Sequence, residues 1–562
     1  MNRAILAVTG IMAALIVAIG VVIVVLVATG GDSDENAGNT QNGTPEDNDG
    51  DDGERTEGEL RLLGPDPLTL DPAIAQDASS AIYIVEIFGG LVSLDPELQV
   101  QADLAAEIPT VENGGKVVNG DGTVTYTFHL RDGLLFHDRT PVTADDVKYS
   151  LERAADPETQ SLVAEFFLGE IVGFDEKLDG TAEDVSGIRV VDEQTVEITI
   201  EEDIPSFLYK LTYPTAYVVD QKQVESDDQW TQRPNGTGPY ELTQWRLGER
   251  IVLEANDHYH LGVPNVQSVR YLLAGSSLTL YEAGDIDVAG VGLDDIERVQ
   301  DPSDALNAEY RTGQRLSIDY IGFNTNSPPF DDPLVRRAFA MAIDKDQIAS
   351  AIFNDAVPVA NGINIPGMPA YSADAQALGF DPEGARALLE QSEYGEELLS
   401  GGLTVSLAES GTGATSGPGT AAIVDMWRQN LGIEVEIQQA ETATFFQDVT
   451  SGRYQAFLLG WIMDYPDEDN LFNLHFDSES PNNDTFYDNP DVDALLREAL
   501  LETDAQRRIE LYQQAEQLII DDVPWIPLFY DRYHVLIKPY VQNYLIPSGI
   551  VERLRFITLD SQ

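Results

Sequence analysis

Short stretches in which apolar and polar residues alternate are interspersed, from Leu60 onward, with stretches of helical periodicity. The alternating pattern, together with one continuous apolar run, predicts β-strands at residues 124–130, 251–254, 402–407 and 456–459. Helical periodicity predicts α-helices at residues 333–348, 382–391, 420–431 and 505–520. Strands that alternate with helices of this length are typical of α/β folds, so we expect an α/β protein.

The segment after the first of these strands carries signals for a turn and for the start of a helix. Residues 131–133 (Arg-Asp-Gly) predict the turn, and Thr143 is followed by Asp145 and Asp146. A threonine can accept a hydrogen bond from an unpaired N–H at a helix start, and acidic side chains in the first turn oppose the helix dipole. We therefore expect a helix that begins directly after Thr143.

The N-terminal region contains the longest apolar run of the chain. Ala4 to Ala28 is an uncharged run of 25 residues, and as a helix it would extend about 37 Å, enough to cross a hydrocarbon core of about 30 Å. A cleaved signal peptide is the alternative, although its apolar region is usually only about 7–15 residues long. We expect residues 1–31 to be an N-terminal transmembrane anchor or signal. Arg3 and the acids beyond the run predict an extracytoplasmic body.

Residues 32–59 have a different composition from the rest of the chain. They include 11 acids and one Arg, with no aromatic and no large apolar residue. Such a segment cannot bury enough apolar surface to offset the loss of conformational entropy on ordering. It is therefore predicted to be an acidic, disordered linker.

The chain as a whole is strongly acidic. Its 562 residues contain 32 Lys and Arg against 97 Asp and Glu, which gives a net charge of −65. Residues 60–562 alone keep −56, so the acidity belongs mainly to the body and not to the linker. A surface of this sign repels phosphate backbones, which argues against nucleic acid as a partner.

The sequence offers little for catalysis or metal binding. It has no cysteine, which excludes disulfides, thiolate zinc sites and Cys nucleophiles. Common hydrolase, phosphate-loop, dinucleotide and zinc-protease motifs are missing as well. His258 and His260 form an H-x-H pair, but no third ligand follows at a suggestive spacing. We predict a protein that is not an enzyme and that carries no metal and no cofactor.

The most informative stretch is Gly460 to Phe472, with the sequence GWIMDYPDEDNLF. The apolar run before it predicts a buried strand that delivers Trp461 and Asp464 to a loop at its C-terminal end, where α/β proteins commonly hold ligands. An aromatic ring three residues from a carboxylate suits a ligand with a cationic end and an apolar body. The alternative is that Trp461 packs in a core and Asp464 caps the next turn.

Motifs spread over nearly the whole body, from about Leu60 to Tyr544, resemble those of one known family. The matching segments are residues 70–72 (LDP), 86–92 (EIFGGLV), 126–133 (YTFHLRDG), 136–147 (FHDRTPVTADDV), 236–240 (GTGPY) with Trp245, 283–288 (AGDIDV), 323–324, 329–332, 336–338, 342–344, 461–472, 511–512, 524–528 (PWIPL) and 538–541 (KPYV). Together they resemble the family 5 extracellular solute-binding proteins, the peptide, oligopeptide and nickel class of ABC importers. Arg139 stands where Gly is usual in that family, and the lipid-anchoring cysteine of many exported members is missing.

The resemblance implies a two-lobed clamshell of the periplasmic-binding-protein kind (type II, cluster C), in which the chain crosses between the lobes twice. Lobe one is expected at residues 60–271, with an extra subdomain at about 86–185. Lobe two is expected at residues 272–528, and residues 529–562 are expected to return to lobe one. The ligand would lie in the cleft and be trapped by hinge closure.

The resemblance also implies a function. The protein would be an extracytoplasmic monomer that captures peptides and delivers them to ABC permease subunits and their ATPases. Asp464 matches the position that pairs with a peptide α-amine, and Trp461 would form the adjacent wall. Tyr240, Tyr271 and Tyr530 match positions that tend to face the cleft or the hinge.

Three other interpretations stay open. The same fold could bind an oligosaccharide or a metal chelate such as a nickel complex. The protein could act as a sensor that binds an extracytoplasmic ligand and signals to a partner without transport. A hydrolase is the third, although the sequence shows no nucleophile or metal constellation for it.

Overall fold

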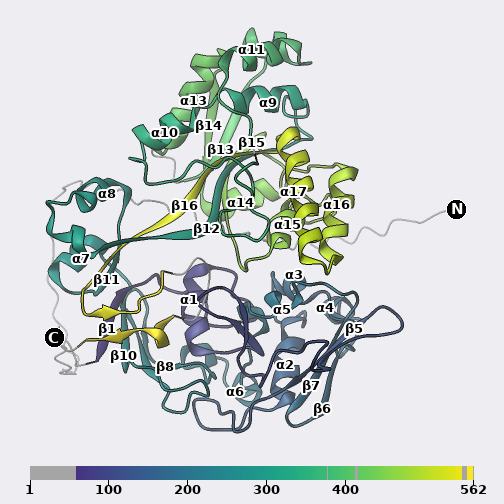
Figure 1. Cartoon of the computed structure of the whole chain (residues 1–562), viewed down its shortest axis with the longest axis vertical. Helices are drawn as coiled ribbons and strands as arrows, with labels where there is room; N and C mark the ends of the chain where they lie inside the picture. Colours follow the sequence, from purple (N-terminus) through teal and green to yellow (C-terminus); the bar gives the residue numbers. More distant parts are fainter. Residues whose placement is uncertain (1–57, 376, 412–415, 547–552, 561–562) are drawn as a thin grey trace, which may run out of the picture.

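A ten-stranded sheet runs from end to end of the molecule (Figure 1), in the order β14-β13-β15-β12-β16-β11-β1-β10-β9-β8. The structure is a computed structural model that describes residues 58–375, 377–411, 416–546 and 553–560. The strands of this sheet, in the same order, are Val435–Ala440, Val405–Ser410, Ala456–Ile462, Tyr310–Phe323, Trp525–Ile537, Val288–Gly290, Glu59–Leu63, Ser268–Leu272, Arg250–Ala255 and Tyr240–Arg246. The predicted strands at 251–254 and 456–459 are confirmed, and the one at 402–407 lies three residues later.

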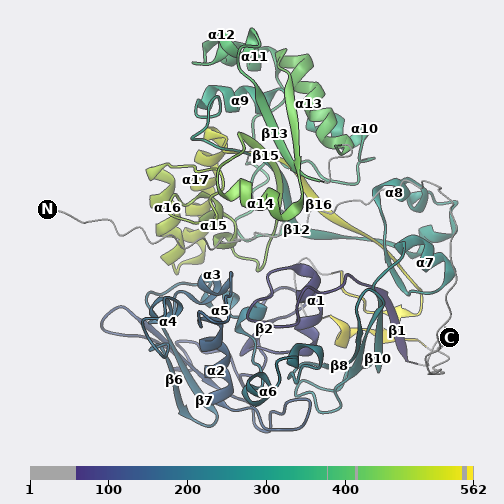
Figure 2. The ribbon, with the colours of Figure 1, turned by 180° about the vertical axis from the view of Figure 1, so that it is seen from behind.

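Two long strands, β12 and β16, connect two halves of the molecule. They pair antiparallel over Tyr310 to Gln314 and again over Ile318 to Gly322, with an irregular register between the two stretches. β12 also pairs with β15, and β16 also pairs with β11. Figures 1 and 2 show one group of helices around each end of this strand pair. The predicted two-lobed α/β architecture is confirmed, and β12 and β16 are its two crossings. We call the half around β1, β8, β9 and β10 lobe one and the half around β13, β14 and β15 lobe two.

Lobe one contains a second, antiparallel sheet in the order β4-β5-β7-β6. Its strands are Lys116–Val118, Val124–His129, Thr195–Ile200 and Ile188–Asp192. The lobe-one helices α1 to α6 are Ala78–Ile87, Ala144–Ala154, Ala164–Leu168, Phe174–Leu178, Phe207–Lys210 and Gln221–Ser226. The side chains of β5, β7 and α2 to α5 share one apolar core. The second sheet continues to Ile200, beyond the predicted end of the extra subdomain at residue 185.

The predicted helix start at Thr143 is confirmed. Thr143 donates to the Asp146 carboxylate from its backbone N–H (2.9 Å) and from its hydroxyl (2.8 Å), and the two residues form a capping box. In the preceding turn, Arg139 has a φ of +71°, a left-handed conformation that glycine adopts more readily. The turn is therefore formed despite the substitution of the usual glycine.

Lobe two has helices on both faces of its sheet. One face carries the helices α9 to α13, which are Pro333–Met341, Lys345–Ala351, Pro382–Gln391, Gly395–Leu399 and Pro418–Leu431. The other face carries α14 to α17, which are Thr442–Thr450, Phe472–Phe476, Pro490–Leu501 and Ala505–Asp522. Alternate residues of β12 enter the two cores, since Ile318 and Tyr320 face α14 to α17 while Ile321 and Phe323 face the other helices.

One predicted helix of lobe two is wrong. The stretch 333–348 forms two helices, because α9 ends at Met341 and Asp344 caps α10 by accepting a hydrogen bond from the Gln347 N–H (2.9 Å). The helices predicted at 382–391, 420–431 and 505–520 are confirmed to within two residues at each end.

The remaining elements are spread over the two lobes, the flank of the crossing strands and the C-terminal end. They are β2 (Val92–Leu94), β3 (Val100–Ala102), α7 (Ser277–Ala283), α8 (Leu293–Gln300), β17 (Val541–Gln542), β18 (Thr558–Leu559) and the short 3-10 turns η1 (Pro214–Ala216), η2 (Trp230–Gln232), η3 (Ala305–Glu309), η4 (Glu468–Asn470) and η5 (Leu554–Phe556). Leu554 and Ile557 are fully buried in the lobe-one core, whereas Phe529 and Tyr530 pack in the cores of lobe two, and the return of residues 529–562 to lobe one stays a prediction. β11 pairs with both β1 and β16, and the assignment of residues 272–309 to lobe two stays a prediction.

No helix within the described residues is long and apolar enough to cross a membrane. The predicted transmembrane anchor at residues 1–31 and nearly all of the predicted linker at 32–59 lie outside the described residues. Glu59, the last residue assigned to the linker, already belongs to β1. It is buried, and its carboxylate accepts a hydrogen bond from Arg270 Nε at 2.9 Å.

Candidate ligand-binding site

The loop that follows β15 lies where lobe two meets lobe one. β15 is a mostly buried strand that pairs antiparallel with β12, and it places Trp461 opposite Ile318. After β15 the chain turns through residues 463–467 into η4 and then into α15. Figures 1 and 2 both show α15 and α16 facing α3 and α5 of lobe one. The site loop, residues 463–470, is therefore positioned by a buried strand on one side and a helix on the other.

Asp464 is held in this loop by one neutral side chain. The Asn470 amide donates to Asp464 Oδ2 (3.0 Å), and Asn470 Oδ1 accepts a hydrogen bond from the Asp464 N–H (2.8 Å). Burial raises the pKa of Asp464 to about 7, and the hydrogen bond from Asn470 opposes that rise. Among the described residues no Lys, Arg or His forms an ion pair with Asp464. The carboxylate is thus a largely buried acid without a cationic partner in this part of the chain.

Tyr465, the next residue, leaves lobe two and enters the core of lobe one. Its ring is 6.5 Å from Phe166, 6.3 Å from Phe167 and 6.4 Å from Tyr209, measured between ring centroids. Only 1% of Tyr465 is exposed, and it belongs to the same apolar core as the second sheet of lobe one. The loop that carries Asp464 is therefore in direct contact with both lobes.

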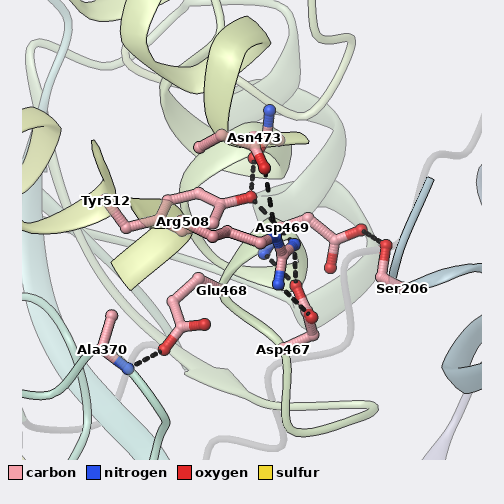
Figure 3. Close-up of polar contacts among 9 residues, drawn as sticks. Ser206, Ala370, Asp467, Glu468, Asp469, Asn473, Arg508 and Tyr512 are labelled. Atoms are coloured by element: carbon pink, nitrogen blue, oxygen red, sulfur yellow. Dashed lines mark hydrogen bonds and ion pairs between the residues drawn. The ribbon is translucent and has the colours of Figure 1, made fainter. Parts of the chain in front are cut away.

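A second contact between the lobes is polar. Ser206 of lobe one donates from its hydroxyl to Asp469 Oδ2 (2.6 Å), and both residues are buried (Figure 3). Burial and the neighbouring Asp467 raise the pKa of Asp469 to about 7, although Lys210 and Arg508 oppose the rise. At the outer rim, Arg497 of α16 forms an ion pair with Glu202.

The acidic turn after Asp464 is fixed by Arg508 of α17. The Arg508 guanidinium donates to both carboxylate oxygens of Asp467, each at 2.6 Å (Figure 3). Burial acts to raise the pKa of Asp467, but the charge and hydrogen bonds of Arg508 prevail, and the pKa is lower than usual. Glu468 accepts a hydrogen bond from the Ala370 N–H, which ties the turn to the loop before α11.

Trp461 lies beside the site loop but is mostly buried. Its ring meets the edge of His475 at 4.5 Å, and the indole N–H has no hydrogen-bond partner within the described residues. Tyr530 of β16 also lies opposite Ile318, so Trp461, Ile318 and Tyr530 form one row across three strands. The Tyr530 hydroxyl points at the carbonyl oxygens of Gly362 (3.0 Å) and Asn364 (2.9 Å). Its single proton is therefore engaged by the protein itself.

Tyr240 and Tyr271 lie in the core of lobe one, in strands β8 and β10. The Tyr240 hydroxyl donates to the Val266 carbonyl at 3.2 Å, and the ring of Tyr271 meets Tyr83 edge-on at 4.9 Å. Both tyrosines are almost completely buried. The structure therefore places Trp461 and Tyr530 in one row of lobe two and Asp464 in the loop that follows Trp461. Contact of any of these residues, or of Tyr240 or Tyr271, with a ligand stays a prediction.

Sequence reasoning missed three members of the site. Asn470 holds Asp464, Tyr465 enters lobe one, and Ser206 contacts Asp469 from the other lobe. Asn470 and Tyr465 belong to the stretch that the sequence singles out, and an amide six residues after a carboxylate is a usable signal for a loop closed by hydrogen bonds. Ser206 is separated from Asp469 by 263 residues, and no local pattern points to it.

One histidine of the H-x-H pair contacts a carboxylate. His260 Nε2 is 2.7 Å from Asp103 Oδ1, and within the described ranges no group of three His, Cys, Asp or Glu side chains could hold a metal ion. A groove of about 330 Å³ opens at the outer rim between α3 and α16, where the ion pair of Arg497 and Glu202 lies. It does not include Asp464 or Trp461.

Two lobes joined by two strands, with a loop between them that presents a carboxylate without a cationic partner among the described residues, are typical of a two-lobed ligand-binding protein. The chain belongs to the bacterial extracellular solute-binding proteins, family 5, whose model ("family 5 Middle") matches residues 99–483. The family expected from the sequence motifs is confirmed.

Individual relatives match along most of the chain. The chain is 31% identical over 493 residues to the "Probable deoxycholate-binding periplasmic protein YgiS" of Escherichia coli, which covers 85% of this chain and 89% of that protein. It is 31% identical over 508 residues to the "Periplasmic oligopeptide-binding protein OppA" of Salmonella typhimurium, with 86% and 89% covered. The structure of the Escherichia coli murein tripeptide binding protein MppA is similar with a TM-score of 0.74 at 25% identity, over 90% of this chain and 99% of that chain.

Proposed function

We propose that this chain is the substrate-binding protein of an ABC importer, which captures peptides with a free α-amine between its lobes and delivers them to the permease. The carboxylate of Asp464 carries this proposal, because it lies at the lobe boundary without a cationic partner among the described residues. Burying an unpaired carboxylate is costly, and a ligand ammonium would supply the missing charge. The oligopeptide-binding and murein-tripeptide-binding relatives support a peptide ligand.

The mechanism follows from the contacts between the lobes. Insertion of Tyr465 into lobe one and the hydrogen bond from Ser206 to Asp469 favour a closed arrangement in which the site loop is covered. Exclusion of water strengthens the ion pair between Asp464 and an ammonium. Trp461 would form the wall next to the amine, with Tyr530 behind it in the same row. For Tyr240 and Tyr271, burial favours a packing role in lobe one.

The proposed location is extracytoplasmic, with the chain held at the membrane by Ala4 to Ala28 and separated from it by the acidic linker. The periplasmic relatives support the location, and the 25-residue apolar run supports the anchor. The partners would be ABC permease subunits and their ATPases, and the protein would act as a monomer. It would bind peptides without converting them, so a peptide recovered after incubation should be intact by mass spectrometry.

Calorimetry with matched peptides tests the assignment of Asp464. The wild type should bind free-amine peptides more tightly than the same peptides with an acetylated N-terminus. Asp464→Ala should cost about 2–5 kcal/mol of binding free energy for the free-amine peptide, because it removes a buried charge partner. Equal affinity for free and acetylated peptides, or unchanged affinity in Asp464→Ala, would contradict the proposal.

A second candidate ligand comes from the relative named for deoxycholate binding. Deoxycholate has an apolar body but bears a carboxylate, and Asp464 would repel it when ionised. A thermal-shift screen should therefore rank free-amine di- to pentapeptides above deoxycholate, xylo- and cello-oligosaccharides and nickel chelates at pH 7.5 and above. If deoxycholate or a sugar raises the melting temperature and no peptide does, that compound and not a peptide is the ligand. If the permease subunits do not associate with the liganded protein, a sensor becomes the better interpretation.

A further inference from the structure

Asn470 makes two hydrogen bonds to a single residue, Asp464. Its Nδ2 donates to Asp464 Oδ2 (3.0 Å) and its Oδ1 accepts from the Asp464 N–H (2.8 Å). Because the backbone N–H can only donate, the oxygen of the amide must face it and the amide nitrogen must face the carboxylate. No part of Asn470 is exposed to solvent. Asn470 therefore fixes both the backbone and the carboxylate of Asp464.

The position of Asn470 is itself determined by α17. The Asn470 N–H donates to the Asp467 carbonyl (3.2 Å) within η4. The Asp467 side chain is held by two 2.6 Å hydrogen bonds from Arg508 (Figure 3). Helix α17 thus holds Arg508, and Arg508 holds the acidic turn. The turn positions Asn470, which positions Asp464. Such a chain of support is what a binding group needs to keep its direction.

The side chain of Asn470 carries no charge, and this determines what Asp464 can bind. A Lys or Arg in its place would neutralise Asp464 from within the chain and occupy the oxygens that a ligand ammonium needs. An amide supplies a single hydrogen bond to Oδ2 and leaves the negative charge uncompensated. Among the described residues, the phenols of Tyr213 and Tyr465 are close enough for Asp464 to act on them electrostatically, and burial raises the pKa of each well above its usual value, so both stay neutral.

We propose that Asn470 is a positioning residue for ligand recognition, which holds one oxygen of Asp464, favours its charged form and leaves the other oxygen for the cationic end of the ligand. The inference rests on the proposed function, since it assigns a role to Asn470 only through Asp464. It goes beyond that function because it assigns to the Asn470 amide the stabilisation of the charged form of Asp464, a largely buried carboxylate, at neutral pH. The hydrogen bond opposes the pKa rise that burial imposes on Asp464.

Asn470→Asp tests this role with almost no change in shape. In its ionised form the new side chain cannot donate to the Asp464 carboxylate, and it adds a like charge beside it. Affinity for a free-amine tripeptide should fall at least tenfold at pH 7.5, and the pH midpoint of binding should rise by about one unit. Asn473→Asp is the matched control, because Asn473 contacts Tyr512 and the Leu496 carbonyl and not Asp464. It should leave the pH midpoint unchanged. If Asn470→Asp does not unfold cooperatively, Asn470→Ala is used, and a smaller upward shift is expected because it removes the hydrogen bond without adding a charge.

The outcomes separate this inference from the proposed function. Suppose the wild type prefers free-amine to acetylated peptides, but the pH midpoint of peptide binding is the same in Asn470→Asp and Asn473→Asp. This result would contradict the positioning role of Asn470 and would still support the peptide site. A wild type that does not distinguish free from acetylated peptides would overturn both. A shift in Asn470→Asp that disappears when Asp464→Asn is added would show that Asn470 acts through Asp464, and persistence of the shift in the double variant would contradict it.

Discussion

Asp464 and Asp467 lie three residues apart in one loop but have opposite electrostatic surroundings. Asp467 is paired with the Arg508 guanidinium, which outweighs the effect of burial and lowers its pKa. Asp464 receives only the amide of Asn470, so burial prevails and raises its pKa to about 7. The Asp467 carboxylate is therefore held in an internal ion pair, whereas the Asp464 carboxylate can form an ion pair with a ligand. Asp484 and Glu516 are also buried carboxylates whose pKa is raised to about 7 without a cationic partner among the described residues, so what distinguishes Asp464 is its place in the loop between the two lobes.

The pKa of Asp464 predicts a pH dependence of peptide binding. A ligand ammonium stabilises the charged carboxylate, so the pKa in the complex is lower than the value of about 7 in the free protein. Below pH 7 binding must displace a proton, and the affinity should fall by up to about tenfold per pH unit. Above pH 7 it should level off, and it should fall again once the peptide α-amine, with a pKa of about 7.7–8.0, loses its proton.

Titration calorimetry between pH 5 and pH 8.5 measures this dependence. Asp464→Asn should bind more weakly and lose the dependence near pH 7, because an amide does not titrate. Affinity that rises as the pH falls from 7 to 5 would contradict the prediction.

At the scale of elements, the loop after β15 connects two cores that belong to different lobes. Trp461 packs in the core of lobe two, and Tyr465, four residues later, packs among Phe166, Phe167 and Tyr209 of lobe one. The pairing between β12 and β16 is irregular between its two stretches, which is where a strand pair can bend. Closure of the lobes and coverage of Asp464 are therefore linked through one aromatic side chain.

Tyr465→Ala should weaken closure of the lobes. It removes ring contacts worth about 0.5–1.5 kcal/mol in addition to the buried area, so peptide affinity should fall about tenfold or more. The radius of gyration from X-ray scattering should also decrease less on peptide binding than in the wild type.

Tyr465→Phe is the matched control for this change. The Tyr465 hydroxyl has no hydrogen-bond partner within the described residues, so its loss should leave compaction and affinity close to wild type. If Tyr465→Ala binds and compacts like Tyr465→Phe, the ring does not contribute to closure.

At the scale of the whole molecule, charge acts on stability rather than on recognition. Residues 60–562 carry a net charge of −56, and most of these acids have no individual role in the site. Repulsion of this size destabilises the compact state while keeping the chain soluble. The surface should also disfavour contact with anionic lipids.

Salt should therefore stabilise the protein. Raising NaCl from about 0.05 M to 1 M shortens the Debye length from above 10 Å to about 3 Å and screens the repulsion between exposed carboxylates. The Tm of the ligand-free protein, measured by calorimetry at pH 7.5, should rise by several degrees. Sucrose at equal osmolarity is the control for non-electrostatic effects, and a Tm that rises equally in sucrose or falls in salt would contradict the prediction.

The sequence by itself determined the α/β class, the helix start at Thr143, the strand that leads to Trp461 and the stretch that carries Asp464. These features depend on alternation, capping residues and motifs that lie within a few residues of one another. The same local signals failed at 333–348, because periodicity continued across the break that Asp344 caps.

Only the tertiary structure decided which side chains share an environment. It put Tyr240 and Tyr271 in the core of lobe one, separated Asp464 from every cation of the described residues, and brought Ser206 to Asp469. Such relations arise when distant segments pack together and burial changes the cost of a charge, and neither effect is encoded in the spacing of residues along the chain.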